Sequence, residues 1–243
     1  MTKSTNGGFT LIESMLFLAI SGLISIGIMV GAMASINQQR YRDASNSLVD
    51  YFQGELNLVL NVQNDQRADS VVCNSGGVVV GGADEDRGTS DCSLVGRIVY
   101  SKADSKGLIS KTVLATADIT ESTAGVTEIE ALRNANLVVS ELETKDYDLE
   151  WGAGMAETLP TPELPRQFSM LIVRSPTTGL LRTYSVSLPD RAISDILDTA
   201  DPSRSMTVCI NSNGLTGGRR NGVVILGGAS NSSGVKFING GQC

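Results

Sequence analysis

Few side chains in this 243-residue sequence have the types and spacing that enzyme chemistry requires. It contains no histidine, which excludes the Ser-His and Cys-His nucleophile pairs and every imidazole metal site. Its four cysteines form no C-x-x-C motif, which argues against a zinc ribbon and a thioredoxin-type redox site. We therefore expect a protein that is not an enzyme and that has neither a metal site nor a cofactor.

The cysteines are better explained as structural disulfides. Four cysteines allow three pairings, and the sequence alone does not choose among them. The nearest-neighbour pairing joins Cys73 to Cys92 and Cys209 to Cys243, and we favour it because short loops lose the least entropy on closure. Disulfides persist in oxidising compartments, so the segment that carries them is expected to fold outside the cytoplasm.

Two loops carry charges that could bind a ligand. Arg219 and Arg220 lie in the glycine-rich run GLTGGRRNG, where they could contact the phosphates of DNA. The net charge of −7 opposes a polyanion, so two solvated arginines in a turn are the favoured interpretation. The run GGADEDRGTSD at 81–91 has enough carboxylates for a calcium loop but no EF-hand spacing, which favours a solvated loop.

A long apolar run follows the N-terminal residues. The 26 residues from Ser14 to Gln39 include no charge, and as a helix they would be about 39 Å long. Because a hydrocarbon core is about 30 Å thick, we expect a membrane-spanning segment at about 14–36. Glu13 stands at the head of this run, and an acid at the centre of a membrane helix costs roughly 2.5 to 3.5 kcal/mol, less near the interface. It either reaches the headgroups or pairs with a positive group on another chain.

The sequence GGFTLIES at 7–14 resembles the cleavage and N-methylation site of type IV pilins and of the similar pseudopilins of type II secretion. These proteins have a short polar leader that ends in glycine, then an aromatic residue, a glutamate and a long apolar helix. The resemblance implies that a prepilin peptidase cuts between Gly8 and Phe9, removes the leader 1–8 and methylates the new amine of Phe9. It also implies that Glu13 neutralises the N-terminal amine of a neighbouring subunit.

The same resemblance implies a structural role, a location and a set of partners. The chain would be a single-pass protein of the inner, cytoplasmic membrane, and would then enter a cell-surface pilus of pilin subunits through an assembly platform and motor. Such filaments serve adhesion, motility or DNA uptake. The large, cysteine-bounded head favours a minor pilin over the major subunit. The alternatives are a pseudopilin of type II secretion, an uptake pilin that binds DNA through Arg219 and Arg220, and an anchored surface domain unrelated to pili.

The residues after the apolar run predict that the helix continues to about residue 62, so that it covers 9–62. Apolar residues recur there at three- and four-residue spacing, which is typical of an amphipathic helix that packs under a globular head. They are Tyr41, Ala44, Leu48, Phe52, Leu56 and Val59. Three glycines of the membrane half, Gly22, Gly27 and Gly31, weaken it by about 1 kcal/mol each relative to alanine. They permit either local unwinding or close helix packing.

The segment 63–243 is predicted to be a β-rich head with two disulfides, which makes the fold class α+β, with a long N-terminal helix on an antiparallel sheet, as in type IV pilins. Runs rich in β-branched residues predict the strands. They are expected at 93–101, 136–142, 147–151, 168–175, 180–188, 206–210, 222–226 and 235–238. The turn SPTTG predicts a hairpin over 168–188, and short helices are expected near Thr127, from a capping box with Glu130, and after Asp190.

Overall fold

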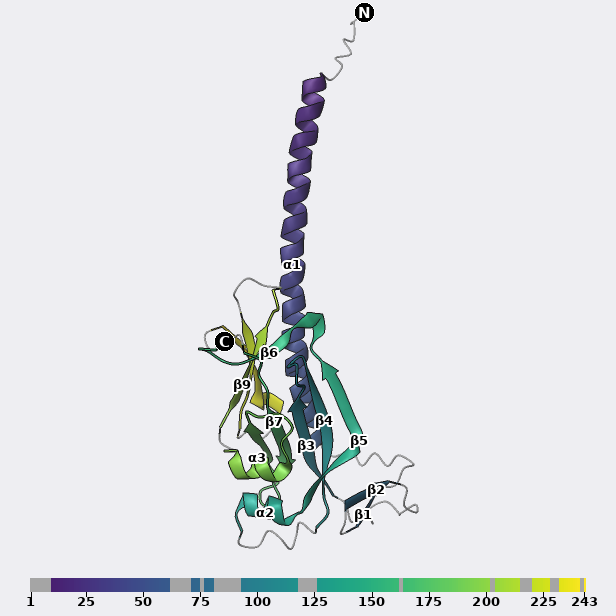
Figure 1. The fold of residues 1–243 in the computed structure, drawn as a ribbon, viewed down its shortest axis with the longest axis vertical. Coiled ribbons are helices and arrows are strands. Elements are labelled where there is room, and N and C mark those ends of the chain that lie inside the picture. Colours follow the sequence, from purple (N-terminus) through teal and green to yellow (C-terminus); the bar gives the residue numbers. More distant parts are fainter. Residues whose placement is uncertain are drawn as a thin grey trace, which may run out of the picture.

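The computed structural model describes residues 10–61, 71–74, 77–80, 93–117, 126–161, 164–201, 204–214, 220–227, 232–240 and 243. Its longest element is α1, Leu11–Leu60, a single helix of 50 residues. The N-terminal part of α1 projects as a rod from a head made mainly of strands (Figure 1). We call residues 11–39 the anchor half of α1 and residues 40–60 its head half.

The head half of α1 is amphipathic, as predicted. All six residues of the expected stripe are buried, each with at most 2% of its surface exposed. A stripe at this spacing occupies one side of a helix, and that side faces the strands of the head. The predicted apolar stripe is therefore confirmed at Tyr41, Ala44, Leu48, Phe52, Leu56 and Val59.

Two antiparallel sheets form the body of the head. The larger sheet has the strand order β5-β4-β3-β7-β8. Its strands are β3 (Ser93–Ser101), β4 (Gly107–Ala115), β5 (Leu137–Asp148), β7 (Ser169–Arg174) and β8 (Leu181–Val186). The smaller sheet has the order β11-β10-β9-β6. Its strands are β6 (Gly154–Ala156), β9 (Met206–Asn211), β10 (Asn221–Ile225) and β11 (Val235–Asn239). A separate antiparallel hairpin joins β1 (Val71–Asn74) to β2 (Gly77–Val80).

Short helices complete the described part of the head. They are α2 (Glu128–Asn134), α3 (Ile193–Thr199) and the 3-10 turns η1 (Glu150–Gly152) and η2 (Ser232–Gly234). Both predicted short helices are confirmed. Helix α2 begins with the expected capping box, in which Thr127 accepts from the backbone N–H of Glu130 and the Glu130 carboxylate accepts from Thr127.

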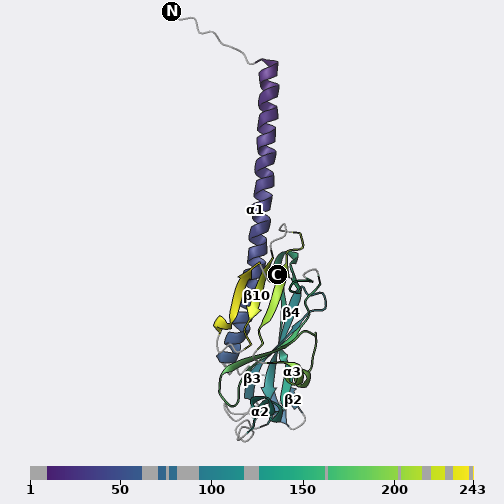
Figure 2. The same ribbon diagram turned by 90° about the vertical axis from the view of Figure 1, so that its left-hand side faces the viewer.

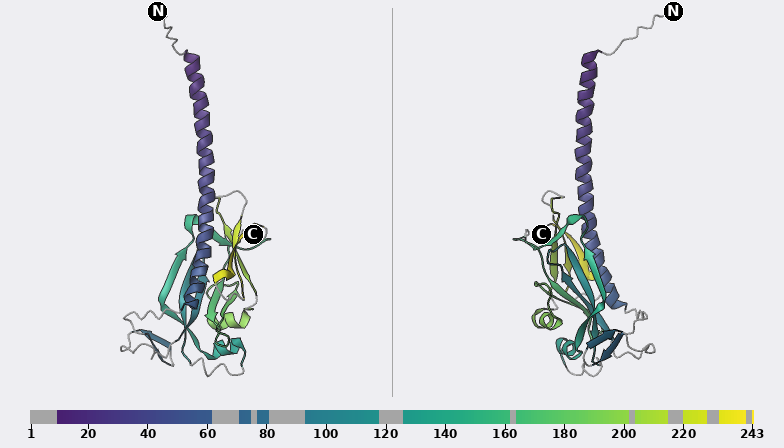
Figure 3. Two further views of the ribbon diagram at one scale, coloured as in Figure 1. Left: turned by 180° about the vertical axis from the view of Figure 1, so that it is seen from behind. Right: turned by 45° about the vertical axis from the view of Figure 1, so that its right-hand side comes forward.

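The head half of α1 lies between the two sheets (Figure 3). It forms the main core with residues of both, among them Val99 and Ile172 of the larger sheet and Val208 and Val223 of the smaller one. The opposite face of the larger sheet carries a second core under α2 and α3. In Figure 2 these two helices lie toward the end of the head that is far from the anchor half.

Strand β7 shows why the larger sheet needs both cores. Successive side chains of a strand point to opposite faces. Met170 and Ile172 accordingly belong to the core around α1, whereas Leu171 and Val173 belong to the core under α2 and α3. A strand covered on both faces reads as a continuous apolar run rather than as an alternating one, which explains the run SMLIVR of β7.

The structure corrects the expectation of a single sheet, since the predicted strands divide between two. The hairpin over 168–188 is confirmed as β7 paired with β8. Strands β1, β2 and β4 and the three-residue strand β6 were not predicted. The strand expected at 136–142 is the first part of the long strand β5. The strand expected at 147–151 is largely wrong, because β5 ends at Asp148 and the turn η1 begins at Glu150.

Candidate functional site

Glu13 caps the exposed end of α1 together with Thr10. The Thr10 hydroxyl accepts a hydrogen bond from the backbone N–H of Glu13 at 3.3 Å. Atom Oε2 of Glu13 accepts from both the backbone N–H and the hydroxyl of Thr10 at 3.1 Å. This capping box points the carboxylate toward the helix N-terminus, where the helix dipole stabilises a negative charge. Within the described part of the chain, Oε1 makes no hydrogen bond, so the carboxylate can still accept from a further donor.

The anchor half beyond Glu13 is an uncovered apolar surface. Its large apolar side chains from Leu11 to Ile36 are 46 to 75% exposed. Two of its serines satisfy their hydroxyls internally, because Ser21 donates to the carbonyl of Phe17 at 2.6 Å and Ser25 donates to that of Ser21 at 2.8 Å. Among the described residues, α1 is the one helix that is long and apolar enough to cross a membrane. A surface of this kind needs lipid or other helices to cover it.

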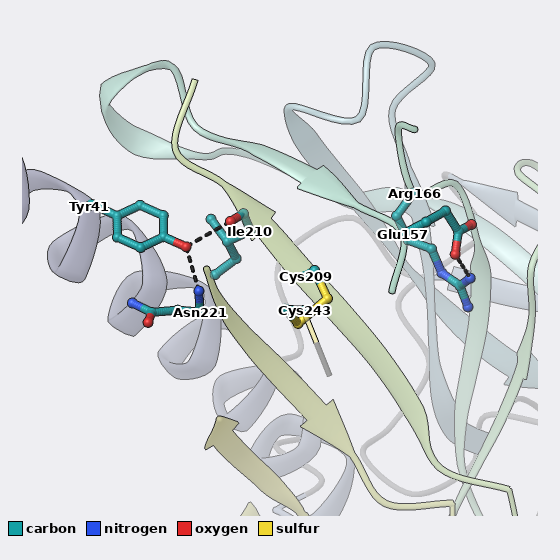
Figure 4. The surroundings of a disulfide bond; sticks show 7 residues. All are labelled: Tyr41, Glu157, Arg166, Cys209, Ile210, Asn221 and Cys243. Carbon is teal, nitrogen blue, oxygen red and sulfur yellow. Dashed lines mark hydrogen bonds and ion pairs between the residues drawn. A yellow bond between two sulfur atoms is a disulfide. The ribbon is translucent and has the colours of Figure 1, made fainter. Parts of the chain in front are cut away.

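Tyr41, near the start of the head half of α1, binds two strands of the head. The buried hydroxyl of Tyr41 donates to the carbonyl of Ile210 on β9 at 2.7 Å and accepts from the backbone N–H of Asn221 on β10 at 2.5 Å (Figure 4). Burial raises the pKa of Tyr41 above its ordinary value, while the Asn221 hydrogen bond and the charge of Arg220 oppose the rise. Tyr41 thus fastens α1 to two strands of the smaller sheet.

A buried ion pair fastens α1 to the larger sheet about four turns further along the helix. Nε of Arg97 on β3 donates to Oε2 of Glu55 at 2.8 Å, and both side chains are at most 4% exposed. The remaining guanidinium nitrogens donate to the hydroxyls of Thr112 and Ser110 on β4, each at 2.8 Å. The charges are therefore paired and hydrogen-bonded, the condition under which a protein interior tolerates them.

The disulfide between Cys209 and Cys243 lies beside the Tyr41 contacts (Figure 4). It joins β9 to the C-terminal segment across a sequence separation of 34 residues, with the two Cα atoms 5.5 Å apart. Gly222 on β10 faces the bond, and a Cβ atom there would lie 2.6 Å from the sulfur of Cys243. This half of the predicted pairing is confirmed.

Several residues singled out from the sequence lie outside the described residues. They are Gly8, Phe9, Cys92, Arg219 and the acidic run 81–91. The pairing of Cys73 with Cys92 therefore stays a prediction, and so do the cleavage site and the solvated loop at 81–91. Arg220 is described and is half-buried, close enough to the Tyr41 hydroxyl to influence its pKa.

Neither attachment of α1 to the sheets was predicted from the sequence. The burial of Glu55 could have been predicted, because it lies three residues after Phe52 and four before Val59, on the apolar side of the helix. A carboxylate at such a position predicts a buried cationic partner. No comparable signal pointed to the Tyr41 hydroxyl, whose partners are backbone groups 169 and 180 residues away.

A comparison with protein-family models finds no match, and comparisons with curated proteins and with solved structures find none either.

Proposed function

We propose that this chain is a structural subunit of a type IV pilus-like filament, most simply a minor pilin. The observation that carries the proposal is the combination of the GGFTLIES motif with the helix that follows it. That helix leaves its anchor half uncovered and ends in an α+β head. The subunit would stay in the membrane until assembly and then pack its anchor half against those of other subunits.

Glu13 would have its role at the assembly step. Cleavage between Gly8 and Phe9 would leave a methylated amine four residues before Glu13. When anchor halves pack together, water leaves the region, and an unpaired carboxylate becomes strongly destabilising. A buried charge that loses its partner costs about 3 to 5 kcal/mol. The amine of a neighbouring subunit would remove this penalty, so that Glu13 selects the correct stagger between subunits.

Intact mass spectrometry of the chain from a host with a prepilin peptidase tests the processing step. We expect the mature chain to lack residues 1–8, to carry one methyl group on Phe9 and to contain no free thiol. A substitution Gly8→Leu is expected to leave the leader attached. A membrane-bound chain that keeps its leader in such a host would contradict the proposal and favour an unrelated anchored domain.

Three variants separate the charge of Glu13 from its capping role. Glu13→Gln keeps an acceptor for the capping box but loses the charge, and it is expected to fail to enter filaments. Glu13→Asp keeps the charge and is expected to retain partial incorporation. Thr10→Ala weakens the cap by about 1 kcal/mol and is expected to assemble. The measured quantity is the amount of subunit in sheared filaments. Normal incorporation of Glu13→Gln would show that Glu13 does not need its charge to pair with a neighbouring amine.

The described residues do not favour the alternative of DNA binding. Arg220 is half-buried beside Tyr41, whereas a phosphate contact requires an accessible guanidinium.

A further inference from the structure

Trp151 is the single tryptophan of the chain, and it stands out on the surface of the head. It is 51% exposed, although its ring could bury more area than almost any other side chain. Its backbone is left-handed, with φ 59° and ψ 23°, a conformation that is rare for a bulky residue. The guanidinium of Arg40 lies 4.6 Å from the centre of the ring, in the geometry of a cation–π contact.

The position of Trp151 along the axis of α1 is defined by Arg40. Turn η1 follows β5 and precedes β6, at the end of the head from which the anchor half emerges (Figure 1). Arg40 is the first charged residue after the apolar run, and it lies four residues, or about 6 Å, beyond the expected end of the span at Ile36. The headgroup region of a bilayer is about 5 to 7 Å thick on each side. Trp151 therefore lies at headgroup height when the anchor half spans the membrane.

Close to Arg40 and Trp151 in the sequence, the two cations Arg40 and Arg42 are matched by the two acids Asp43 and Glu150. These four residues carry no net charge with which to attract anionic lipids. Trp151 offers an indole ring, and rings with an apolar body and a polar N–H concentrate at membrane–water interfaces. The Cα–Cβ bond of Arg40 tilts toward the helix N-terminus, so that its side chain leads toward the membrane.

We propose that Trp151, held against Arg40, inserts into the headgroup region of the phospholipid membrane while the subunit is embedded there. The indole fixes the depth of the anchor half and the tilt of the head on the membrane surface. Assembly into a filament would then have to withdraw this ring from the lipid. The inference rests on the membrane-embedded stage of the proposed function.

Because Trp151 is the only tryptophan, its fluorescence in the full chain reports on its position directly. The chain is reconstituted at low density into phosphatidylcholine vesicles with bromine atoms either high on the acyl chain or near its end. Two matched reporters are made in the Trp151→Phe background. Phe17→Trp lies within the expected span. Leu180→Trp lies in the β7–β8 hairpin at the far end of the head, and Leu180 is 46% exposed, close to the 51% of Trp151.

We expect the Trp151 emission to be shifted to shorter wavelength and quenched more strongly by the shallow bromines than by the deep ones. Phe17→Trp is expected to be quenched most by the deep bromines, and Leu180→Trp by neither set but readily by iodide in solution. If Trp151 behaves like Leu180→Trp while Phe17→Trp is quenched, the inference is wrong and the membrane stage stands. If Phe17→Trp is also unquenched, both the inference about Trp151 and the membrane stage of the proposed function are wrong. A Trp151 emission that shifts in filaments but not in vesicles would overturn the inference in favour of a subunit contact.

Discussion

The two halves of α1 form one uninterrupted helix in two different environments. Phe17 in the anchor half is 70% exposed, whereas Phe52 in the head half is fully buried. Apolar residues surround the anchor half on all sides, but they form a single stripe on the head half. A helix that is apolar all round belongs in a membrane or among other helices, and a striped helix belongs on the surface of a core.

The stability of each half has a different origin. The head half is held by the core between two sheets, by Tyr41 and by the pair of Glu55 with Arg97. The anchor half has backbone hydrogen bonds and a capping box, and its large apolar side chains remain exposed. Substitutions of one residue type in the two halves should therefore differ in their effect on the folding of the head. The chain offers matched pairs for this comparison.

The largest expected effect is the loss of the head in alkali while the anchor half stays helical. All five tyrosines lie outside the anchor half, and burial raises the pKa of each, to about 12 for Tyr100. Above pH 10 the tyrosines of the unfolded chain, whose ordinary pKa is 10.0, lose their protons, whereas those of the folded head keep them. The contribution of these tyrosines to the free energy of unfolding is therefore fully present below pH 10 and is lost as the pH rises toward about 12.

In detergent micelles, the ultraviolet absorbance of phenolate and the near-ultraviolet circular dichroism of the head should change together in one transition above pH 10. The helical signal that remains should match a chain in which only the anchor half is folded. Tyrosines that titrate individually near their ordinary pKa while the head stays folded would contradict the prediction.

The two glutamates of α1 make the second comparison. Glu55→Ala leaves Arg97 buried without its carboxylate, and we expect the free energy of unfolding of the head to fall by about 3 to 5 kcal/mol. Glu13→Ala changes an exposed residue far from the head, and its effect on the same quantity is expected to stay within about 0.5 kcal/mol. Urea unfolding of the full chain in micelles measures both. Equal losses in the two variants would show that the halves do not fold independently.

The two phenylalanines test the apolar contacts in the same way. Phe52→Ala opens a cavity in the core beside Phe168, whose ring centre lies 6.3 Å away, and should lower the free energy of unfolding by about 3 to 5 kcal/mol. Phe17→Ala removes no contact within the head and is expected to change it by less than about 0.5 kcal/mol. The same urea unfolding measures both variants. If Phe17→Ala lowered the free energy of unfolding of the head, the anchor half would have to pack on the head.

The smallest effect concerns glycine inside the helix. Gly54 is exposed, and a Cβ atom there would meet no atom within 4 Å, so Gly54→Ala should raise the free energy of unfolding of the head by about 1 kcal/mol. Gly27 is equally open in the single chain, but Gly27→Ala is expected to leave that quantity unchanged, because the anchor half does not take part in the unfolding of the head. Thermal unfolding of the two variants in parallel checks the difference.

Elements with a strong local pattern could be predicted from the sequence. The stripe from Tyr41 to Val59, the hairpin over 168–188 and the capping box at Thr127 all depend on residues close together in the chain, and the structure contains each of them. The disulfide between Cys209 and Cys243 followed from loop length. At the candidate site, the local sequence predicted the apolar surface and the position of Glu13 at its head.

The remaining features depend on partners far away in the chain. Strand β4 was not predicted because Ser110 and Thr112 interrupt its apolar pattern, and these hydroxyls are buried to bind Arg97 of the neighbouring strand. Strand β6 has three residues and exists through its pairing with β9. The division into two sheets follows from the position of α1 between them. A single sequence contains no direct record of such long-range contacts.

The continuity of α1 also determines how the molecule would carry tension. A pull on the anchor half travels along the helix axis and reaches side-chain contacts that extend from Tyr41 to Val59, over about 27 Å. These contacts lie beside the axis, so they are loaded in shear and share the force instead of failing one after another. Tyr41 passes part of the load to the smaller sheet, and Glu55 passes part to the larger one. The disulfide holds β9 to Cys243, so that the strand under load is covalently tied on its far side.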